Sequence, residues 1–477
     1  MASTANYVPL CIDLDGTLIR SDTLFESVLQ LLKHAPWLSF ALPFWLLGGK
    51  AQLKARVAER TELPAASLPY REDFVAWARD QAELRPVILV TAAHRRIADT
   101  VARHLGFFSE VLATDDVNLK AQRKADVLAR RFGERGFDYA GNDRPDVVVW
   151  KRARAAIVVG ATPRVAAAAH AHAIVEREFD PAPGRVTRLR SWIRALRLYQ
   201  WIKNVLVFVA PAAGHTLFEP ATLQATMLAY VAFGLAASGV YLLNDLLDLP
   251  SDRRHPRKRR RPFASGALPL AGGLVLSPTL VGASVLLAAA INHRFLIALL
   301  AYLVCTTTYS MWLKRRTFID VAMLAALYTL RVVAGAAAAG LTLSFWLLAV
   351  CAYGFLGLAL LKRYAELRTM ETEGHVAVAG RGYVTSDVPV VLALGVGASL
   401  LATLVTALYI ESYAGMALYA RPEMLWVLVG LMLMGVGRLW LKAGRGQMHD
   451  DPIVFVARDR WSLALVGCAA IAVLLAI

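Results

Sequence analysis

The sequence has little cysteine and little charge. Its four cysteines show neither CxxC spacing nor any other metal-ligand spacing, so we expect neither a disulfide framework nor a thiolate metal site. Charged residues make up 18% of the chain and hydrophobic residues 57%, which is too apolar for an ordinary soluble enzyme. We also expect no signal peptide, because the apolar start at 7–12 is short, lacks a basic flank and precedes acidic residues.

The formal net charge of +16 is distributed in a way that indicates a membrane and not a nucleic acid. Four alternate loops of the C-terminal half hold most of its lysines and arginines, whereas the other loops hold only Arg294 and Arg421. The sequence therefore predicts an integral protein of the bacterial inner membrane, with a cytoplasmic N-terminal domain and an outward C-terminus. The apolar segments, about nine in number, lie at 201–216, 222–243, 270–291, 295–312, 318–340, 344–361, 388–410, 424–441 and 460–477.

Residues 1–180 have the pattern of a separate α/β domain. Short apolar runs alternate with helical patterns, which predicts a doubly wound parallel sheet whose ligands bind at the carboxyl ends of the strands. A helical insertion near 20–84 contains the apolar run 36–48, which is too short to span a bilayer. This run could be a cap helix packed on the domain or a face resting on the membrane. The expected strands lie at 7–12, 86–90, 111–113, 139–140 and 156–159.

The polar residues at these strand ends resemble the motifs of the haloacid dehalogenase phosphatase superfamily. The first strand runs into Asp13-Leu-Asp15-Gly-Thr, the second ends at Thr91, and a helix opens at Lys124. The resemblance implies that Asp13 is a nucleophile that forms an aspartyl-phosphate and that Asp15 is a general acid and base whose backbone carbonyl binds Mg²⁺. Thr91 would hydrogen-bond the phosphate and Lys124 would neutralise it, with Lys120 as the alternative lysine.

The fourth motif of that superfamily departs from the usual pattern. Asn142 stands where a metal-ligating carboxylate is expected, in Gly141-Asn142-Asp143-Arg-Pro-Asp146. Either Asp143 or Asp146 could replace it as a metal ligand, or metal binding could be weak. A purely structural domain of this fold remains the alternative to an active phosphatase.

The segment 181–199 connects the two halves of the chain. It begins in a Pro/Gly-rich stretch at 180–185 and continues as a basic, amphipathic pattern at 185–197. We expect this pattern to lie on the anionic surface of the membrane, before the transmembrane domain at 200–477.

The membrane half is organised around the sequence Asn244-Asp245-Leu-Leu-Asp248-Leu-Pro-Ser-Asp252, at the end of an apolar segment. Its three carboxylates are spaced by three and four residues, so they share one face of a helical turn. Carboxylates at a membrane boundary are costly unless they are paired or bind a metal. Hard oxygen ligands suit Mg²⁺, which commonly bridges carboxylates to substrate phosphates.

This half resembles the UbiA superfamily of intramembrane prenyltransferases. The 244–252 segment fits the superfamily's NDxxDxxxD signature, and the stretches 255–266 and 309–317 fit as well. The resemblance implies an all-α bundle of about nine transmembrane helices around a lateral cavity, with Mg²⁺ holding a diphosphate near the cytoplasmic mouth.

The second acidic motif of that superfamily, DxxxD, is replaced here by Lys362-Arg363-Tyr-Ala-Glu366-Leu-Arg368. A basic wall attracts phosphate directly, so the site suits two phosphorylated substrates better than a diphosphate and a neutral ring. This departure most resembles the branch of polyprenyl-phosphate (decaprenyl-phosphate) phosphoribosyltransferases. The branch transfers 5-phosphoribose from phosphoribosyl diphosphate to a lipid phosphate, and the fused phosphatase domain could then remove the 5-phosphate.

The resemblance assigns roles to the remaining polar residues. The aspartates of the NDxxDxxxD signature would hold Mg²⁺, and Asn244 would orient that shell or the substrate. Glu366 could be a metal ligand or the partner of a neighbouring base. The expected phosphate ligands are Lys314, Lys362, Arg363 and some residues of the basic run 257–261, which includes Arg257 and Lys258.

Asp320 and Arg331, inside one apolar segment, are costly there; they could face the cavity or form a buried ion pair. The alternative substrates are an isoprenyl diphosphate and an aromatic or other acceptor. The alternative of another class is a lipid transporter or scaffold, although no internal repeat is evident.

Overall fold

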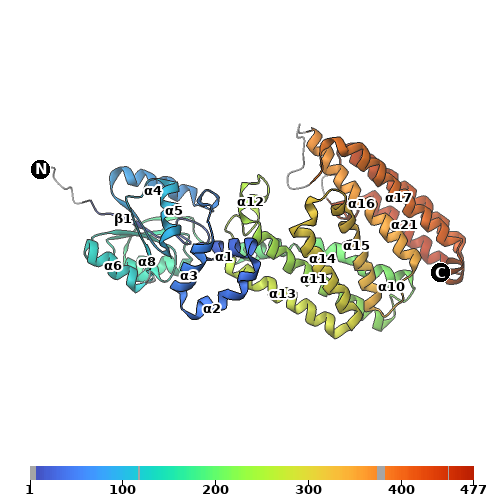
Figure 1. The fold of residues 1–477 in the computed structure, drawn as a ribbon, viewed down its shortest axis with the longest axis horizontal. Helices are drawn as coiled ribbons and strands as arrows, with labels where there is room; N and C mark the ends of the chain where they lie inside the picture. Colours follow the sequence, from blue (N-terminus) through green and yellow to red (C-terminus); the bar gives the residue numbers. More distant parts are fainter. Residues whose placement is uncertain (1–6, 116–118, 373–381, 449–450) are drawn as a thin grey trace. The chain divides into compact units, whose positions relative to one another are not determined.

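The computed structural model describes residues 7–115, 119–372, 382–448 and 451–477 (Figure 1). The chain divides into two compact units. Unit 1 comprises Met1–Leu196 and Tyr241–Pro278, and unit 2 comprises Arg197–Val240 and Thr279–Ile477. Two helices, α11 (Pro220–Leu247) and α13 (Leu270–Ile291), contribute residues to both units.

Unit 1 contains a parallel sheet of six strands in the order β3-β2-β1-β4-β5-β6. The five predicted strands are confirmed. The sixth, β6, was not predicted because its sequence Ile-Val-Glu-Arg-Glu-Phe is charged and largely exposed at the sheet edge. The strands are β1 (Leu10–Ile12), β2 (Val87–His94), β3 (Glu110–Thr114), β4 (Asp138–Gly141), β5 (Ala155–Val159) and β6 (Ile174–Phe179).

Helices cover both faces of this sheet, as the doubly wound prediction requires (Figure 1). Side chains alternate along a strand, so Leu10 and Ile12 enter one core and Cys11 enters the other. The first core is completed by α3 (Lys50–Arg60), α4 (Glu72–Leu84) and α5 (Arg95–Leu105). The second is completed by α6 (Gln122–Phe132), α7 (Asp146–Trp150) and α8 (Pro163–His172).

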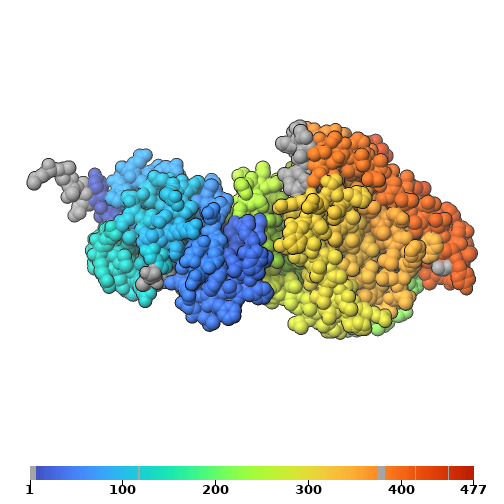
Figure 2. Space-filling view, viewed as in Figure 1, coloured from blue at the N-terminus to red at the C-terminus, as the bar shows by residue number. Residues whose placement is uncertain are grey.

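The predicted helical insertion consists of α1 (Thr23–His34), the 3₁₀ helix η1 (Pro36–Ala41), α2 (Leu42–Leu47) and α3, followed by η2 (Ala65–Ser67) and α4. No residue of η1 or α2 is fully buried, but η1 packs against α1 and α2 packs against α3 within the insertion. Phe40 and Leu47 are 79% and 86% exposed. The segment that contains η1 and α2 belongs to the dark-blue part of the surface in Figure 2. Packing within the cap and exposure of its apolar side chains occur together, so both alternatives for this run stay predictions.

The connecting segment forms α9 (Arg185–Leu196), a helix with exposed Val186, Leu189 and Ile193 among its arginines. The rest of unit 1 surrounds the NDxxDxxxD signature. It comprises the end of α11, α12 (Leu249–Arg254), η4 (Lys258–Arg260) and the start of α13.

In the described residues, seven helices are long and apolar enough to cross a membrane, not the predicted nine. The first predicted segment fails because it forms η3 (Leu198–Phe208), a 3₁₀ helix, and the short α10 (Val209–Ala213) that contains Pro211. The last, α21 (Arg460–Ala476), has only 17 residues. The seven candidates are Pro220–Leu247, Leu270–Ile291, His293–Met311, Ile319–Ala338, Phe345–Thr372, Thr385–Ile410 and Pro422–Gly444.

The elements of unit 2 that bear on function are α14 (His293–Met311), α15 (Ile319–Ala338), α16 (Phe345–Thr372), α17 (Val388–Ile410) and α19 (Leu425–Gly444). Shorter elements connect them: η5 (Leu313–Arg315), η6 (Thr385–Asp387), α18 (Tyr413–Leu418), η7 (Pro422–Met424) and α20 (Pro452–Val456).

Candidate functional site

A cavity of about 420 Å³ lies at the carboxyl ends of β1 and β4 in unit 1. These strands are hydrogen-bonded neighbours, with Ile12 paired to Ala140, so the residues that follow them meet at one edge of the sheet. The structure thereby brings together most of the residues that resemble a phosphatase site. The cavity is lined by Asp13, Asp15, Lys120, Lys124, Asn142, Asp143 and Asp146, among others.

Asp13 forms a buried ion pair with the lysine of α6. The Nζ atom of Lys124 lies 2.7 Å from Oδ1 of Asp13 and donates a second hydrogen bond, of 2.9 Å, to the hydroxyl of Tyr139. Lys120 lines the same cavity, but Lys124 is the lysine that contacts the carboxylate. Tyr139 belongs to β4. It was not among the predicted site residues, because it lies outside the recognised motifs.

Burial raises the pKa of the Asp13 carboxyl to about 6, although Lys124 acts in the opposite direction. Burial, with the Asp22 carboxylate nearby, raises the pKa of Asp15 to about 8. The backbone N–H of Thr23, at the start of α1, donates to Oδ1 of Asp15 at 2.8 Å. The pKa of Asp15 is thus raised further than that of Asp13, which suits a general acid beside a nucleophile.

The fourth-motif residues are engaged within the protein. Oδ2 of Asp146 accepts the backbone N–H groups of Asn142 and Asp143 at 2.9 and 3.0 Å, and Oδ1 accepts the Tyr139 hydroxyl. Asn142 lies over the first-motif loop, where a Cβ on Gly16 would come within 2.2 Å of its Nδ2 atom. Asp146 therefore has little capacity left for a metal.

Thr91 does not line the cavity. It is fully buried, and its Oγ1 atom accepts the Ala93 N–H at 3.0 Å, while the neighbouring Ala92 reaches the cavity. Its role as a phosphate ligand remains a prediction.

The NDxxDxxxD segment spans the break between α11 and α12. Asp248 occupies the break itself, and the backbone hydrogen bonds from Asp248 to Asn244 and from Asp252 to Asp248 continue the helical turn. Nη1 of Arg261 donates to Oδ1 of Asp245 at 3.1 Å and to Oδ2 of Asp252 at 2.7 Å. Both aspartates are buried. Asp248 is half-exposed and lies 3.4 Å from Nζ of Lys33.

Arg261 is thus the residue of the basic run 257–261 that contacts the motif. The sequence indicated this run only as a whole. Arg257 and Lys258 are exposed, and their backbone N–H groups donate to His255 Nδ1 instead. Their predicted role toward a substrate phosphate has no support in the contacts of their side chains.

Across the described ranges, no three Asp, Glu, His or Cys side chains form a group that could hold a metal by themselves. The residue types nevertheless suit a hard cation, because both places offer carboxylate oxygens, although Lys124 pairs with Asp13 and Arg261 pairs with Asp245 and Asp252. Mg²⁺ usually keeps several waters and takes substrate phosphate oxygens, so one or two carboxylates suffice. Asp13 with the Asp15 carbonyl could contribute to one Mg²⁺ site, and one or two aspartates of the NDxxDxxxD signature could contribute to another, with water and substrate phosphate supplying the other ligands.

In unit 2, two lysines meet on one aspartate. Nζ of Lys203, from η3, and Nζ of Lys362, from α16, lie 2.8 and 2.9 Å from Oδ2 of Asp451. The Tyr328 hydroxyl donates to the same oxygen at 3.3 Å. Burial alone would raise the pKa of Asp451, but Lys362 and Lys203 outweigh it and hold that pKa well below its usual range. Sequence reasoning missed Lys203 and Asp451, because neither lies in a recognisable motif.

The other charges of unit 2 are buried and paired. Nη2 of Arg363 lies 2.6 Å from Oδ2 of Asp320, with both side chains fully buried, and the Tyr383 hydroxyl donates to Oδ1 at 2.8 Å. Arg363 also contacts Glu366, which supports the second alternative for that glutamate. Lys314 lies half-buried in η5.

An ion pair between Asp320 and Arg331 is wrong, because Asp320 pairs with Arg363. Arg331 donates instead to Oδ1 of Asn204 at 3.1 Å and to the Tyr302 hydroxyl at 3.0 Å. The two charges are eleven positions apart on α15, about 16 Å along a helix, so each finds a partner on another element.

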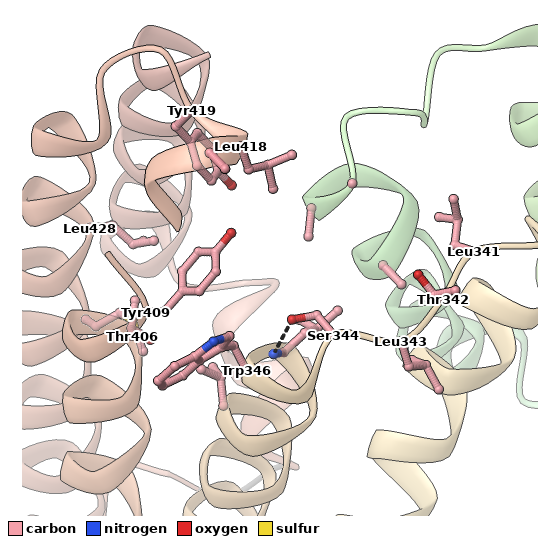
Figure 3. A pocket seen from close by; sticks show the side chains of 17 residues that line it. Leu341, Thr342, Leu343, Ser344, Trp346, Thr406, Tyr409, Leu418, Tyr419 and Leu428 are labelled. Atoms are coloured by element: carbon pink, nitrogen blue, oxygen red, sulfur yellow. Dashed lines mark hydrogen bonds between the residues drawn. The ribbon is translucent and has the colours of Figure 1, made fainter. Parts of the chain in front are cut away.

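An apolar cavity of about 580 Å³ lies elsewhere in unit 2. Figure 3 shows Tyr409, Leu418, Tyr419 and Leu428 on one side, facing the turn 341–344 on the other. A second apolar cavity, of about 340 Å³, shares Leu347, Val350 and Met432 with it and extends along α16 to Leu361. This apolar lining therefore ends one residue before Lys362.

The model of the UbiA prenyltransferase family matches residues 204–472. The chain therefore belongs to the UbiA prenyltransferase family, and it is a membrane transferase by that membership. An uncharacterized protein of Sinorhizobium fredii is 35% identical over 465 residues, which are 95% of this chain and 88% of that protein.

Two further relatives match the chain in part. Nodulation protein NoeC of Azorhizobium caulinodans is 32% identical over 280 residues, 58% of this chain and 90% of that protein. Decaprenyl-phosphate phosphoribosyltransferase of Corynebacterium glutamicum is 38% identical over 186 residues, 38% of this chain and 56% of that enzyme. The chain thus covers about half the length of this last relative.

Two solved structures are similar to separate parts of the chain. A UbiA homolog from Archaeoglobus fulgidus, bound to GPP and Mg²⁺, has a TM-score of 0.47 and 17% identity, covering 59% of this chain and 99% of that one. A phospho-aspartyl intermediate analogue of phosphoserine phosphatase has a TM-score of 0.26 and 16% identity, covering 37% and 94%.

Proposed function

We propose that this membrane transferase moves 5-phosphoribose from phosphoribosyl diphosphate to a polyprenyl phosphate, and that its N-terminal domain removes the 5-phosphate. The first step is supported by the sequence that replaces the second acidic motif, because this sequence is basic. Lys362 from that sequence, together with Lys203, outnumbers the one carboxylate between them. Such a cluster favours a phosphate over a second metal ion.

In the proposed transfer, Asp245, Asp248 and Asp252 hold Mg²⁺, which when bound stabilises the charge that develops on the leaving diphosphate. The bond from the anomeric carbon to the diphosphate oxygen breaks, and a bond to an oxygen of the lipid phosphate forms. The lipid phosphate is already an anion, so the chain needs no strong general base at this step. Arg261 is placed to bind the diphosphate, because it already lies against two of the motif carboxylates.

Lys362 and Lys203 would bind the phosphate of the lipid acceptor. The two apolar cavities support this assignment, because both are lined by residues of α16, the helix that also carries Lys362. A polyprenyl chain is apolar over its whole length and carries its charge at one end. Its burial along α16 would release water from the chain while the lysines neutralise the headgroup.

In the proposed phosphatase step, Asp13 attacks the phosphorus of a phosphomonoester and Asp15 gives its proton to the departing sugar oxygen. Lys124 offsets the negative charge beside Asp13. Water then cleaves the aspartyl-phosphate, with Asp15 taking a proton from it, and phosphate leaves. The raised pKa of Asp15 supports this order of proton transfers. We further propose that this domain is cytoplasmic and that the C-terminus faces outward, from the distribution of basic loops.

The test is an incubation of membranes containing the protein with two labelled donors in separate reactions. Labelled phosphoribosyl diphosphate with polyprenyl phosphate should give a labelled lipid, and labelled isoprenyl diphosphate should give none. Label transfer from isoprenyl diphosphate alone would instead establish a prenyl transfer. Transfer from neither donor, with the protein correctly inserted, would favour a transporter or scaffold.

A further inference from the structure

Within unit 1, the cap helix α1 touches both the phosphatase-like cavity and the NDxxDxxxD segment. At its first residue, the Thr23 N–H donates to Asp15. Near its last, Nζ of Lys33 donates to the carbonyl of Leu247 at 2.9 Å and lies 3.4 Å from Asp248. Ten helical residues separate these contacts, about 15 Å along the axis. The two acidic centres of unit 1 are thus joined by one short helix.

A buried ion pair fastens α1 to the segment that follows the signature. Nη2 of Arg253 lies 2.5 Å from Oε1 of Glu26, and the two side chains are 8% and 3% exposed. Arg253 also donates to the carbonyls of Ala264 and Ser67, at 3.0 and 3.2 Å. Removing one partner of such a pair leaves an uncompensated buried charge, so the pair fixes the position of the segment.

The same segment supplies a wall of the phosphatase-like cavity. Pro269, Leu270 and Ala271 line the cavity opposite the residues of the sheet. Gly266 has a φ of +72° and lies against Arg20, where an added Cβ would come within 2.5 Å of the Arg20 Cβ atom. Only a glycine allows this close approach, so the backbone of the wall lies directly on the loop that follows the first motif.

This wall is also the beginning of a membrane helix. α13 starts at Leu270, is 22 residues long and is apolar enough to cross a bilayer. The phosphatase-like cavity is therefore bounded by the first residues of a span. Exposed Trp37, Phe40 and Phe44 of the cap belong to the same unit and have the character of a surface that rests on lipid.

We propose that the 262–271 segment of the transferase half forms a substrate-selecting wall of the phosphatase-like centre, which thereby prefers phosphomonoesters carried on a membrane lipid. The Glu26–Arg253 ion pair acts as a clamp that holds the segment in place. Pro269–Ala271 form the wall that selects the substrate. A substrate carried on a lipid reaches this boundary by diffusing in the membrane, and its lipid part can contact the wall. A soluble sugar phosphate has no lipid part for the wall to contact. The inference rests on the proposed phosphatase chemistry of Asp13.

The experiment uses the full-length protein in lipid nanodiscs and two substrates, 5-phosphoribosyl decaprenyl phosphate in the bilayer and ribose 5-phosphate in solution. Arg253→Gln and Glu26→Gln should each lower kcat/KM for the lipid substrate at least about tenfold, because a buried charge loses its partner. Hydrolysis of ribose 5-phosphate should stay within about twofold. Gly266→Ala, which moves the wall without exposing a charge, should have the same selective effect. Arg254→Gln is the control, since Arg254 is exposed and its side chain donates to Pro250 of its own helix.

Equal losses on both substrates, or no loss on either, would overturn the proposal. Hydrogen–deuterium exchange separates this result from a failure of the proposed phosphatase activity. Arg253→Gln should speed exchange over α1 and 262–271, and Arg254→Gln should not. If the wild-type protein hydrolyses neither substrate, the phosphatase assignment is wrong. Unchanged exchange in Arg253→Gln would refute the clamp whatever the activity.

Discussion

The two units carry charged clusters of opposite composition. In unit 1, one arginine, Arg261, lies between Asp245 and Asp252. In unit 2, one aspartate, Asp451, lies between Lys203 and Lys362. The first cluster has more carboxylates than the arginine can neutralise, and the second has more ammonium groups than the aspartate can neutralise.

This difference indicates which ion each cluster favours. Carboxylate oxygens suit a cation and ammonium groups suit a phosphate, so the first cluster is the better metal site of the two and the second is the better phosphate site. A metal-bound leaving group and an anionic acceptor are the two ions that the proposed transfer needs. A prenyl transfer to a neutral ring would require no surplus of positive charge in unit 2.

The largest effect should come from removing a carboxylate of the first cluster. Asp245→Asn should lower phosphoribosyl transfer by at least about 100-fold, because stabilisation of the leaving charge is lost. Transfer is measured as labelled lipid at saturating Mg²⁺. Hydrolysis of ribose 5-phosphate by the same preparation serves as the control for folding. Transfer at the wild-type rate would remove Asp245 from the mechanism.

A smaller loss should follow from removing a lysine of the second cluster. Lys362→Met should reduce transfer roughly 10- to 100-fold and raise KM for polyprenyl phosphate, because a charge-assisted contact to the acceptor disappears. Lys442→Met is the matched control, since Lys442 has the same 27% side-chain exposure and also pairs with an aspartate. If both variants lose transfer equally, the effect of Lys362 is general and not specific to the site.

The internal counterion of the first cluster offers a test that does not depend on turnover. Arg261→Gln should strengthen Mn²⁺ binding several-fold, because the cation no longer competes with a guanidinium for Asp245 and Asp252. Electron paramagnetic resonance of free Mn²⁺ measures this affinity directly. Weaker binding in the variant would show that Arg261 organises the aspartates for the metal.

The smallest effect concerns the stability of unit 2. The depressed pKa of Asp451 means that its carboxylate stabilises the fold above its unfolded pKa, about 3.9, and loses that contribution as pH falls toward the folded pKa. Asp451→Asn should therefore destabilise the protein by about 1 kcal/mol at pH 7. The difference from wild type should shrink below about pH 4. Chemical unfolding in detergent at the two pH values measures it, and a pH-independent difference would contradict the charge-based account.

Local patterns were sufficient to predict much of the fold. Five of the six strands follow from short apolar runs, and the seven long helices follow from apolar length. The edge strand β6 was missed because an edge needs no apolar alternation when one side faces water. The nine-span prediction failed at 201–216, where apolar composition could not reveal a 3₁₀ helix.

Only the site residues that belong to recognised motifs could be predicted. Asp13, Lys124 and Asn142 come together because parallel strands bring their carboxyl ends to one edge. Asp451 and Lys203 were not found, because their pairing joins positions far apart in the chain and has no local signal. The same limit hid the true partner of Asp320, since Arg363 belongs to a different helix.

The most direct test of the whole account is mass spectrometry of the lipid products that the intact protein forms from phosphoribosyl diphosphate and polyprenyl phosphate. The Asp13→Asn variant should accumulate a phosphoribosyl lipid, whereas the wild-type protein should yield the ribosyl lipid, lighter by one phosphate. Identical products from the two proteins would contradict the proposed sequence of transfer and dephosphorylation.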